Sequence, residues 1–247
     1  MSQRLKLIVA YDGARFAGWQ SQSHRNTIQD HIERAFEWVG GERVRVHGAG
    51  RTDAGVHALA QCAHVDVVEK SLSAARWTGA LNALLPPTIR VLRCRYVSKR
   101  FHARHSAKGK VYRYTIWSAP VLPPFKYGRV WHVTAPLDFE VLKGEANHFV
   151  GTHDFAGFAA NRGRPENSTV RTIYSVQARR HGPCLTIEFD GDGFLYKMVR
   201  LIVGAMVNYS LGKLDMKDLT ARLHSRPTDS LPYAAPAHGL FLLGVRY

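Results

Sequence analysis

A single carboxylate, Asp53, lies in a short segment framed by glycines. Residues 48–57 read GAGRTDAGVH, so Asp53 stands between Gly50 and Gly55 and two positions after Arg51. Glycines allow positive φ and a close approach of the backbone to a ligand. A carboxylate held on such a loop can act as a nucleophile or a general base. The alternative is a tight turn in which Thr52 and Asp53 only hydrogen-bond the backbone.

Two tyrosines lie on one face of a predicted strand. In Lys110–Tyr114 the side chains of Tyr112 and Tyr114 alternate with Arg113, which points the other way. A tyrosine ring can stack on a nucleic-acid base, and its hydroxyl can exchange a proton. The alternative is a pair of half-buried aromatic residues with a packing role.

One arginine falls within an apolar helical pattern. In Phe194–Gly204 the apolar residues wrap most of the way around a helix, which places Arg200 in partly buried surroundings. A buried arginine needs an anion. The alternative is a side chain that extends to solvent.

The elements that would position these residues alternate in a regular order. Apolar periodicity and turn residues predict β-α-β-β-α-β in the first half of the chain. The predicted elements are a strand at Leu5–Tyr11, a helix at Thr27–Val39, strands at Arg43–His47 and Ala58–Val67, a helix at Ala74–Leu84 and a strand at Ile89–Val97.

The second half resembles the first in pattern. Its predicted elements are a strand at Lys110–Trp117, a Pro-rich connector at Ala119–Pro136, a helix at Phe139–Val150, strands at Val170–Arg180 and Leu185–Phe189, helices at Leu195–Tyr209 and Met216–His224, and a strand at Leu240–Val245. We therefore predict an α+β fold of two ferredoxin-like (RRM-like) subdomains, residues 1–105 and 106–247. They would share an extended, mainly antiparallel sheet, with helices on one face and an RNA cleft on the other.

The charge of the chain indicates a polyanionic partner. The 247 residues carry a formal net charge of +15, and the sequence pI is about 10.1. No acidic residue occurs between Glu69 and Asp138, where 13 cations fall. These are Lys70, Arg76, Arg90, Arg93, Arg95, Lys99, Arg100, Arg104, Lys108, Lys110, Arg113, Lys126 and Arg129. The alternative is a solvated basic face that serves solubility.

Metal and cofactor motifs are weak. His102 and His105 form the only close histidine pair, and no cysteine or carboxylate stands at ligand spacing from them. The glycine segment lacks the third glycine of a dinucleotide fingerprint and the Lys-Ser/Thr of a phosphate loop. We expect neither a metal nor an organic cofactor.

Composition also predicts the compartment. The three cysteines are odd in number, widely spaced and set in apolar runs, as expected for core residues in a reducing environment. Met1–Lys6 leads directly into a strand pattern without a signal peptide, and the apolar run Leu201–Val207 is too short to span a bilayer. We expect a cytoplasmic protein that does not enter the membrane.

The segment Gly50–His57 resembles the signature of the tRNA pseudouridine synthase A family. Further segments similar to that family follow in order along nearly the whole chain. They are Tyr11-Asp12-Gly13, Gly18-Trp19-Gln20, Phe101-His102-Ala103-Arg104, Tyr112-Arg113-Tyr114, Gly151-Thr152-His153-Asp154-Phe155, Arg171-Thr172-Ile173 and Met198-Val199-Arg200. The sequence departs from the family pattern at Lys197, where a histidine is common, and at Leu201, where an asparagine is.

This resemblance implies an enzyme that isomerises uridine to pseudouridine in the anticodon stem-loop of tRNA. The target, at about positions 38 to 40, must leave its stack to be reached. The resemblance implies Asp53 as the catalytic carboxylate, Tyr112 as the active-site ring and Arg200 as the cation that pairs with Asp53. Expected substrate contacts are Arg51, Thr52, His57, Arg104, Lys108, Lys110 and Arg113.

The resemblance also implies a homodimer and no cofactor. Two other functions remain open at this point. One is the same isomerisation on another structured RNA, and the other is a non-catalytic RNA-binding module.

Overall fold

The computed structural model describes residues 2–23, 26–68, 72–160, 168–224 and 233–247. Of the 13 cations in the acid-free stretch, Lys70 lies outside the described residues. The chain forms two units. Unit 1 comprises residues 1–108 and 241–247, and unit 2 comprises residues 109–240.

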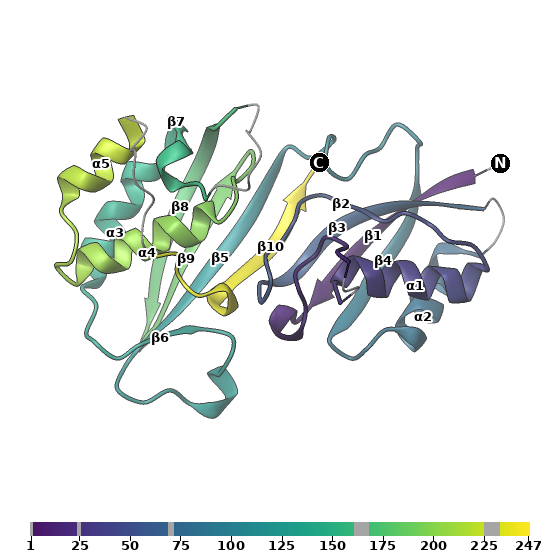
Figure 1. The fold of residues 1–247 in the computed structure, drawn as a ribbon, viewed down its shortest axis with the longest axis horizontal. Coiled ribbons are helices and arrows are strands. Elements are labelled where there is room, and N and C mark those ends of the chain that lie inside the picture. Colours follow the sequence, from purple (N-terminus) through teal and green to yellow (C-terminus); the bar gives the residue numbers. More distant parts are fainter. Residues whose placement is uncertain (1, 24–25, 69–71, 161–167, 225–232) are drawn as a thin grey trace. The chain divides into compact units, whose positions relative to one another are not determined.

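Unit 1 is built on a sheet with the strand order β4-β1-β3-β10. Strand β1 is antiparallel to β3 and β4, whereas β10 runs parallel to β3, and the short β2 pairs with β3. Helices α1 and α2 lie against one face of this sheet (Figure 1). The elements are β1 Ser2–Tyr11, α1 Ile28–Gly40, β2 His47–Gly48, β3 His57–Val68, α2 Ala74–Leu84, β4 Ile89–Val97 and β10 Leu240–Arg246.

Local sequence signals explain the first helix and its packing. Helix α1 begins after Thr27, which forms a capping box with Asp30, and ends at Gly40, where the C-cap Gly41 adopts the left-handed conformation. Its Phe36 ring packs 4.9 Å from the ring of Trp77 on α2. Alternate side chains of β1 are buried toward the helices. These buried side chains include Leu5, Leu7 and Val9. Each such side chain contributes about 1.5–3 kcal/mol of burial free energy.

In unit 2 the strand order is β5-β9-β8-β7, and these neighbours pair in antiparallel fashion throughout. The short β6 pairs in parallel with β5. Helices α3, α4 and α5 lie on one side of these strands (Figure 1). The elements are β5 Gly109–Ser118, β6 Trp131–Val133, α3 Phe139–Ala146, β7 Gly151–Asp154, β8 Val170–His181, β9 Cys184–Gly191, α4 Met198–Ser210 and α5 Met216–His224.

The α+β class and the mainly antiparallel pairing are confirmed. The predicted order β-α-β-β-α-β is present in unit 1, although the strand expected at Arg43–His47 shortens to His47–Gly48. Within the described residues, no helix has both the length and the apolarity that a membrane span requires.

In the second half, two predicted helices need correction and two short strands were missed. The helix expected from Leu195 begins at Met198, because Lys197 has a positive φ of 59° and interrupts the regular backbone. The helix expected over Phe139–Val150 ends at Ala146, and a 3-10 turn follows. Strands β6 and β7 were not predicted, since three or four residues are too few to show periodicity.

Candidate active site

Asp53 opens a tight turn immediately before strand β3. The Val56 N–H donates to the Asp53 carbonyl oxygen at 3.1 Å, and Gly55 between them has a φ of 79°. Glycine at this place in a four-residue turn is typical of type II geometry. The backbone thus turns sharply after Asp53, whose side chain is half-exposed.

The segment 12–20 supports this turn through close backbone contacts. The Trp19 N–H donates to the Thr52 carbonyl oxygen at 3.1 Å. Gly18 has a φ of 88°, and a Cβ atom there would lie 2.5 Å from the same oxygen. At Gly13, a Cβ atom would lie 2.0 Å from the Val56 carbonyl oxygen. Only glycine lets these two stretches of backbone approach so closely.

Thr52 and His57, two of the predicted substrate contacts, are buried in these supporting contacts. The Thr52 hydroxyl lies 2.9 Å from the Tyr11 hydroxyl, and the Gly13 N–H donates to His57 Nδ1 at 3.1 Å. The His57 ring stacks on Phe241 with centroids 4.6 Å apart. With exposed fractions of 6% and 2%, Thr52 and His57 have most of their surface buried in the contacts that hold the loop in place.

Arg51 is exposed and oriented by two glutamines. Its Nε donates to Gln20 Oε1 at 3.2 Å, and Gln20 Nε2 donates to Gln29 Oε1 at 2.9 Å. Burial raises the pKa of Tyr11, so its phenol stays protonated and able to donate near neutral pH. The sequence did not predict these supporting roles of Tyr11, Gln20 and Gln29. The available signals were the family-like segments Tyr11-Asp12-Gly13 and Gly18-Trp19-Gln20.

The two tyrosines of β5 lie in unit 2 and differ in their surroundings. Tyr112 is 7% exposed, and its ring meets Phe194 edge-on with centroids 5.2 Å apart. Tyr114 is fully buried and donates its hydroxyl hydrogen to the Pro236 carbonyl oxygen at 2.7 Å. Burial raises the pKa of Tyr114. Tyr114 is therefore a packing residue, while Tyr112 lies next to the turn that precedes α4.

Arg200 lies in the first turn of α4 and is partly buried, as the apolar pattern predicted. Its Nε donates to the Ala235 carbonyl oxygen at 2.7 Å, and the Ala235 N–H donates back to the Arg200 carbonyl oxygen at 2.9 Å. These two bonds fix the stem of the side chain against the segment that leads to β10. The Nε–H that Ala235 holds is one of the five N–H donors of a guanidinium group.

The other predicted RNA contacts are distributed over both units. In unit 1, Arg104 and Lys108 are exposed. In unit 2, Lys110 is half-buried, and Arg113 pairs with Glu188 directly across the β5–β9 ladder at 2.7 Å. This pairing partly neutralises Arg113, so it is a weaker phosphate ligand than an exposed arginine would be.

Four histidine rings gather beneath the segment that carries Arg104. His64 stacks on His47 and meets His102 edge-on, and His102 lies next to His105. His64 Nδ1 accepts a hydrogen bond from the Ala103 N–H at 3.1 Å. Within the described part of the chain, no group of three or more His, Cys, Asp or Glu side chains is suited to a metal ion. The cluster is a packing feature that anchors the segment.

His64 is expected to make the stability of the protein depend on pH. Burial, followed by the charges of Arg4 and the neighbouring histidines, lowers its pKa from 6.5 to about 4. Between these two pH values the unfolded chain binds a proton that the folded protein does not bind. The free energy of unfolding should therefore fall as the pH drops through this range, by on the order of 1–3 kcal/mol.

Urea denaturation of the wild type and of His64→Asn, near neutral pH and near pH 5, checks this expectation. The asparagine Oδ1 can take the place of Nδ1 as acceptor for the Ala103 N–H, but the side chain does not titrate. We expect a weaker pH dependence in the variant. An equal dependence in both proteins would mean that other groups cause the effect.

Comparison with known proteins assigns the family. A family model described as tRNA pseudouridine synthase matches residues 7–106 and 146–247. The tRNA pseudouridine synthase A of Akkermansia muciniphila is 45% identical over 251 residues, covering 99% of this chain and 95% of that protein. The protein of the same name from Acetivibrio thermocellus is 40% identical over 245 residues, covering 99% of this chain and all of that protein.

Among solved structures, one match is a crystal structure of a Cbf5-Nop10-Gar1 complex. It has a TM-score of 0.34 and 13% sequence identity, and the alignment covers 97% of this chain and 47% of that chain. The chain thus spans about half the length of that solved protein chain. On the family model and the near full-length relatives, the chain belongs to the tRNA pseudouridine synthase family.

Proposed function

We propose that this protein isomerises uridine to pseudouridine in the anticodon stem-loop of tRNA, without a cofactor. The observation that carries the proposal is the Asp53 turn. Its neighbours Thr52 and His57 are buried and bonded within unit 1, while the Asp53 side chain is half-exposed. Such a rigid support for one reactive carboxylate is what covalent or acid–base catalysis requires.

The reaction moves the uracil from an N1 to a C5 linkage on the same sugar. The N1–C1′ bond breaks, the base turns, a C5–C1′ bond forms and the proton on C5 leaves. The Asp53 carboxylate serves this exchange by attacking the sugar, by attacking the base, or by taking a proton from the sugar. All three routes need an ionised carboxylate with a fixed direction.

Tyr112 and Arg200 complete the proposed catalytic set. In this proposal the Tyr112 ring stacks on the detached uracil, and its hydroxyl accepts the C5 proton. Arg200 binds the Asp53 carboxylate through guanidinium N–H groups other than the Nε that Ala235 holds. The resemblance to the family supports both roles, and the fixed stem of Arg200 is consistent with a directed guanidinium.

Base extrusion and RNA binding follow from the exposed cations. The target uridine must leave its stack, at a cost of a few kcal/mol. We propose that Arg51, oriented by Gln20, helps to hold the extruded nucleotide. Exposed Arg104 and Lys108 would contact phosphates. Lys110 and Arg113 are also proposed contacts, although Lys110 is half-buried and Arg113 is paired with Glu188.

Three further features belong to the proposal. Each unit is proposed to be ferredoxin-like, which the order β4-β1-β3 with β2 paired to β3 supports for unit 1. The protein is proposed to work as a homodimer, so that one tRNA can contact both copies. It is proposed to act in the cytoplasm, in line with its cysteine usage.

Tritium release from C5-labelled uridine in unmodified tRNA tests the function, with a chelator present and no cofactor added. We expect release from a tRNA with uridine in the anticodon stem-loop, and none when only those uridines are replaced by cytidine. Release from another structured RNA but not from tRNA would favour the alternative function, which is the same isomerisation on an RNA other than tRNA. Tight tRNA binding without any release would favour a non-catalytic binding module.

A further inference from the structure

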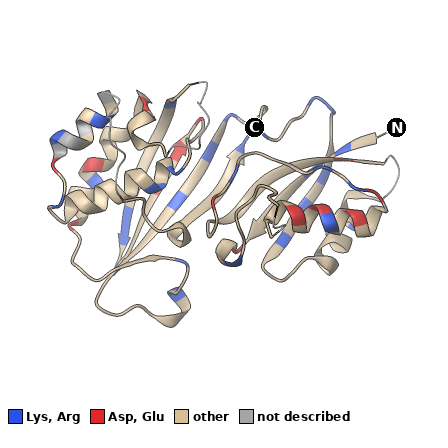
Figure 2. Ribbon diagram, in the orientation of Figure 1, with Lys and Arg blue, Asp and Glu red and all other residues tan. Residues whose placement is uncertain are grey.

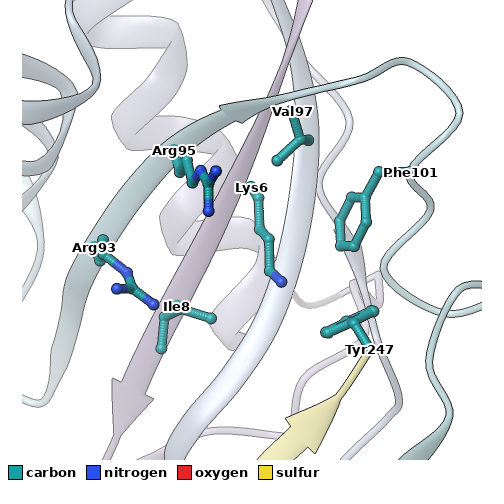
Figure 3. A pocket seen from close by; sticks show the side chains of 7 residues that line it. All are labelled: Lys6, Ile8, Arg93, Arg95, Val97, Phe101 and Tyr247. Atoms are coloured by element: carbon teal, nitrogen blue, oxygen red, sulfur yellow. The ribbon is translucent and has the colours of Figure 1, made fainter.

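A basic pocket lies in unit 1 on the face of the sheet opposite the helices. Its volume is about 180 Å³, and none of the predicted site residues lines it. The lining residues are Lys6, Ile8, Arg93, Arg95, Val97, Phe101 and Tyr247 (Figure 3). The side chains thus combine three cations with an apolar wall and two aromatic rings.

The cations face one another across the β1–β4 ladder. Lys6 lies directly opposite Arg95, and Ile8 lies opposite Arg93 in the same register. Like charges directly opposite each other destabilise a sheet. The next residue of β1 on the same face, Arg4, has an acidic partner, since it pairs with Asp66 at 2.7 Å. None of the seven lining residues is an aspartate or a glutamate, so no acidic side chain of the pocket pairs with Lys6, Arg93 or Arg95.

Lys6 is held in a defined position by the two rings. Its Nζ lies 4.0 Å from the centroid of the Tyr247 ring and 4.8 Å from that of Phe101. The Tyr247 hydroxyl is itself fixed by donating to the Ala103 carbonyl oxygen at 2.8 Å. In Figure 3 Lys6 lies between these rings and the two arginines. A cation–π contact orients the ammonium without neutralising it, so the pocket remains strongly electropositive.

Charge is distributed unevenly between the two sides of unit 1. Helix α1 carries three acidic residues, Asp30, Glu33 and Glu37, and one arginine, Arg34, whereas the charged residues of the pocket are all basic. Figure 2 shows the acidic residues on α1 and the basic residues on the strands. The unbalanced positive charge of the pocket therefore attracts an anionic ligand to the strand side.

We propose that this pocket binds the phosphodiester backbone of the RNA substrate, at a site separate from the catalytic nucleotide. Arg93 and Arg95 are exposed and present planar forks that suit phosphate oxygens, and Lys6 supplies a fixed point charge between them and the rings. Ile8 and Val97 provide an apolar wall for the sugar. The contact is sequence-independent and raises affinity for tRNA of any base sequence. The inference rests on the proposed function in taking RNA as the ligand.

The double variant Arg93→Gln/Arg95→Gln tests the pocket, with binding of unmodified tRNA measured over a range of salt concentrations. We expect Kd to rise about tenfold and the slope of log Kd against log salt to fall by about 1 to 2. In the tritium assay KM should rise with kcat nearly unchanged. Lys6→Met, which keeps much of the apolar stem, should weaken binding in the same direction. The matched control is Arg179→Gln/Arg180→Gln, which removes the same charge from exposed positions on β8.

A stability measurement separates a ligand site from a structural role. Because Arg95 faces Lys6, Arg95→Gln should leave Tm unchanged or raise it while weakening tRNA binding. Unchanged binding by the pocket variants, or an equal loss in the β8 control, would overturn the proposal. A wild-type protein that binds tRNA but releases no tritium would instead count against the proposed function, so the two failures are distinguishable.

Discussion

Replacement of Asp53 by asparagine is expected to reduce tritium release by about 10³-fold or more, while tRNA binding and folding stay close to wild type. Asparagine has nearly the same shape but is neither a nucleophile nor a base at neutral pH. The turn itself uses the Asp53 carbonyl oxygen, which the substitution retains. Loss of catalysis should therefore occur without loss of the loop.

The measurement compares kcat from tritium release with Kd for tRNA and with the free energy of unfolding. Glu42→Gln is the matched control, since it neutralises an exposed carboxylate in a loop of the same unit. The control should retain full activity. Asp53→Asn with more than about a tenth of wild-type turnover would remove the carboxylate from the reaction. Arg200→Lys in the same assay tests the proposed ion pair between Arg200 and Asp53. A rise in KM with an unchanged kcat would exclude this pair.

Local signals in the sequence predicted the regular elements of unit 1 well. Helix α2 and strand β4 have the predicted ends, because Ser73 caps the helix and Pro86-Pro87 stops it before the alternating strand begins. Arg43–His47 shows the opposite case. Its residues alternate in character, but only His47 enters the ladder with β3, where it pairs with His64. Pairing depends on a distant partner, which local alternation does not specify.

The sequence marked the loop that carries Asp53, but it did not show the contacts that support this loop. The glycines around Asp53 marked the loop, since their conformational freedom is visible in the sequence. The bonds of Thr52 to Tyr11 and of Arg51 to Gln20 join residues 41 and 31 positions apart. Such contacts depend on how segments 12–20 and 48–57 pack, so Thr52 and His57 were assigned to the substrate although both are buried.

Gly18 shows how strongly this packing matters, and Gly18→Ala is expected to cost about 3 kcal/mol or more of stability and to lower kcat about 10- to 100-fold. The new methyl group would lie 2.5 Å from the Thr52 carbonyl oxygen and 3.0 Å from the Asp53 carbonyl carbon. Backbone atoms cannot rotate away, so the Asp53 turn must shift. The positive φ of 88° adds strain for any residue with a Cβ atom.

Gly41→Ala separates these two causes. Gly41 also has a positive φ, of 73°, but a Cβ atom there would have no atom within 4 Å. It should therefore show only the conformational strain, about 1 kcal/mol, with kcat unchanged. Urea denaturation and tritium release, the latter at a temperature where all variants are folded, give both quantities. If Gly18→Ala lost stability but kept wild-type kcat, contact with segment 12–20 would stabilise unit 1 without positioning the carboxylate. A loss of kcat in Gly18→Ala that Gly41→Ala does not share would show that the Gly18 contact holds Asp53 in its reactive direction.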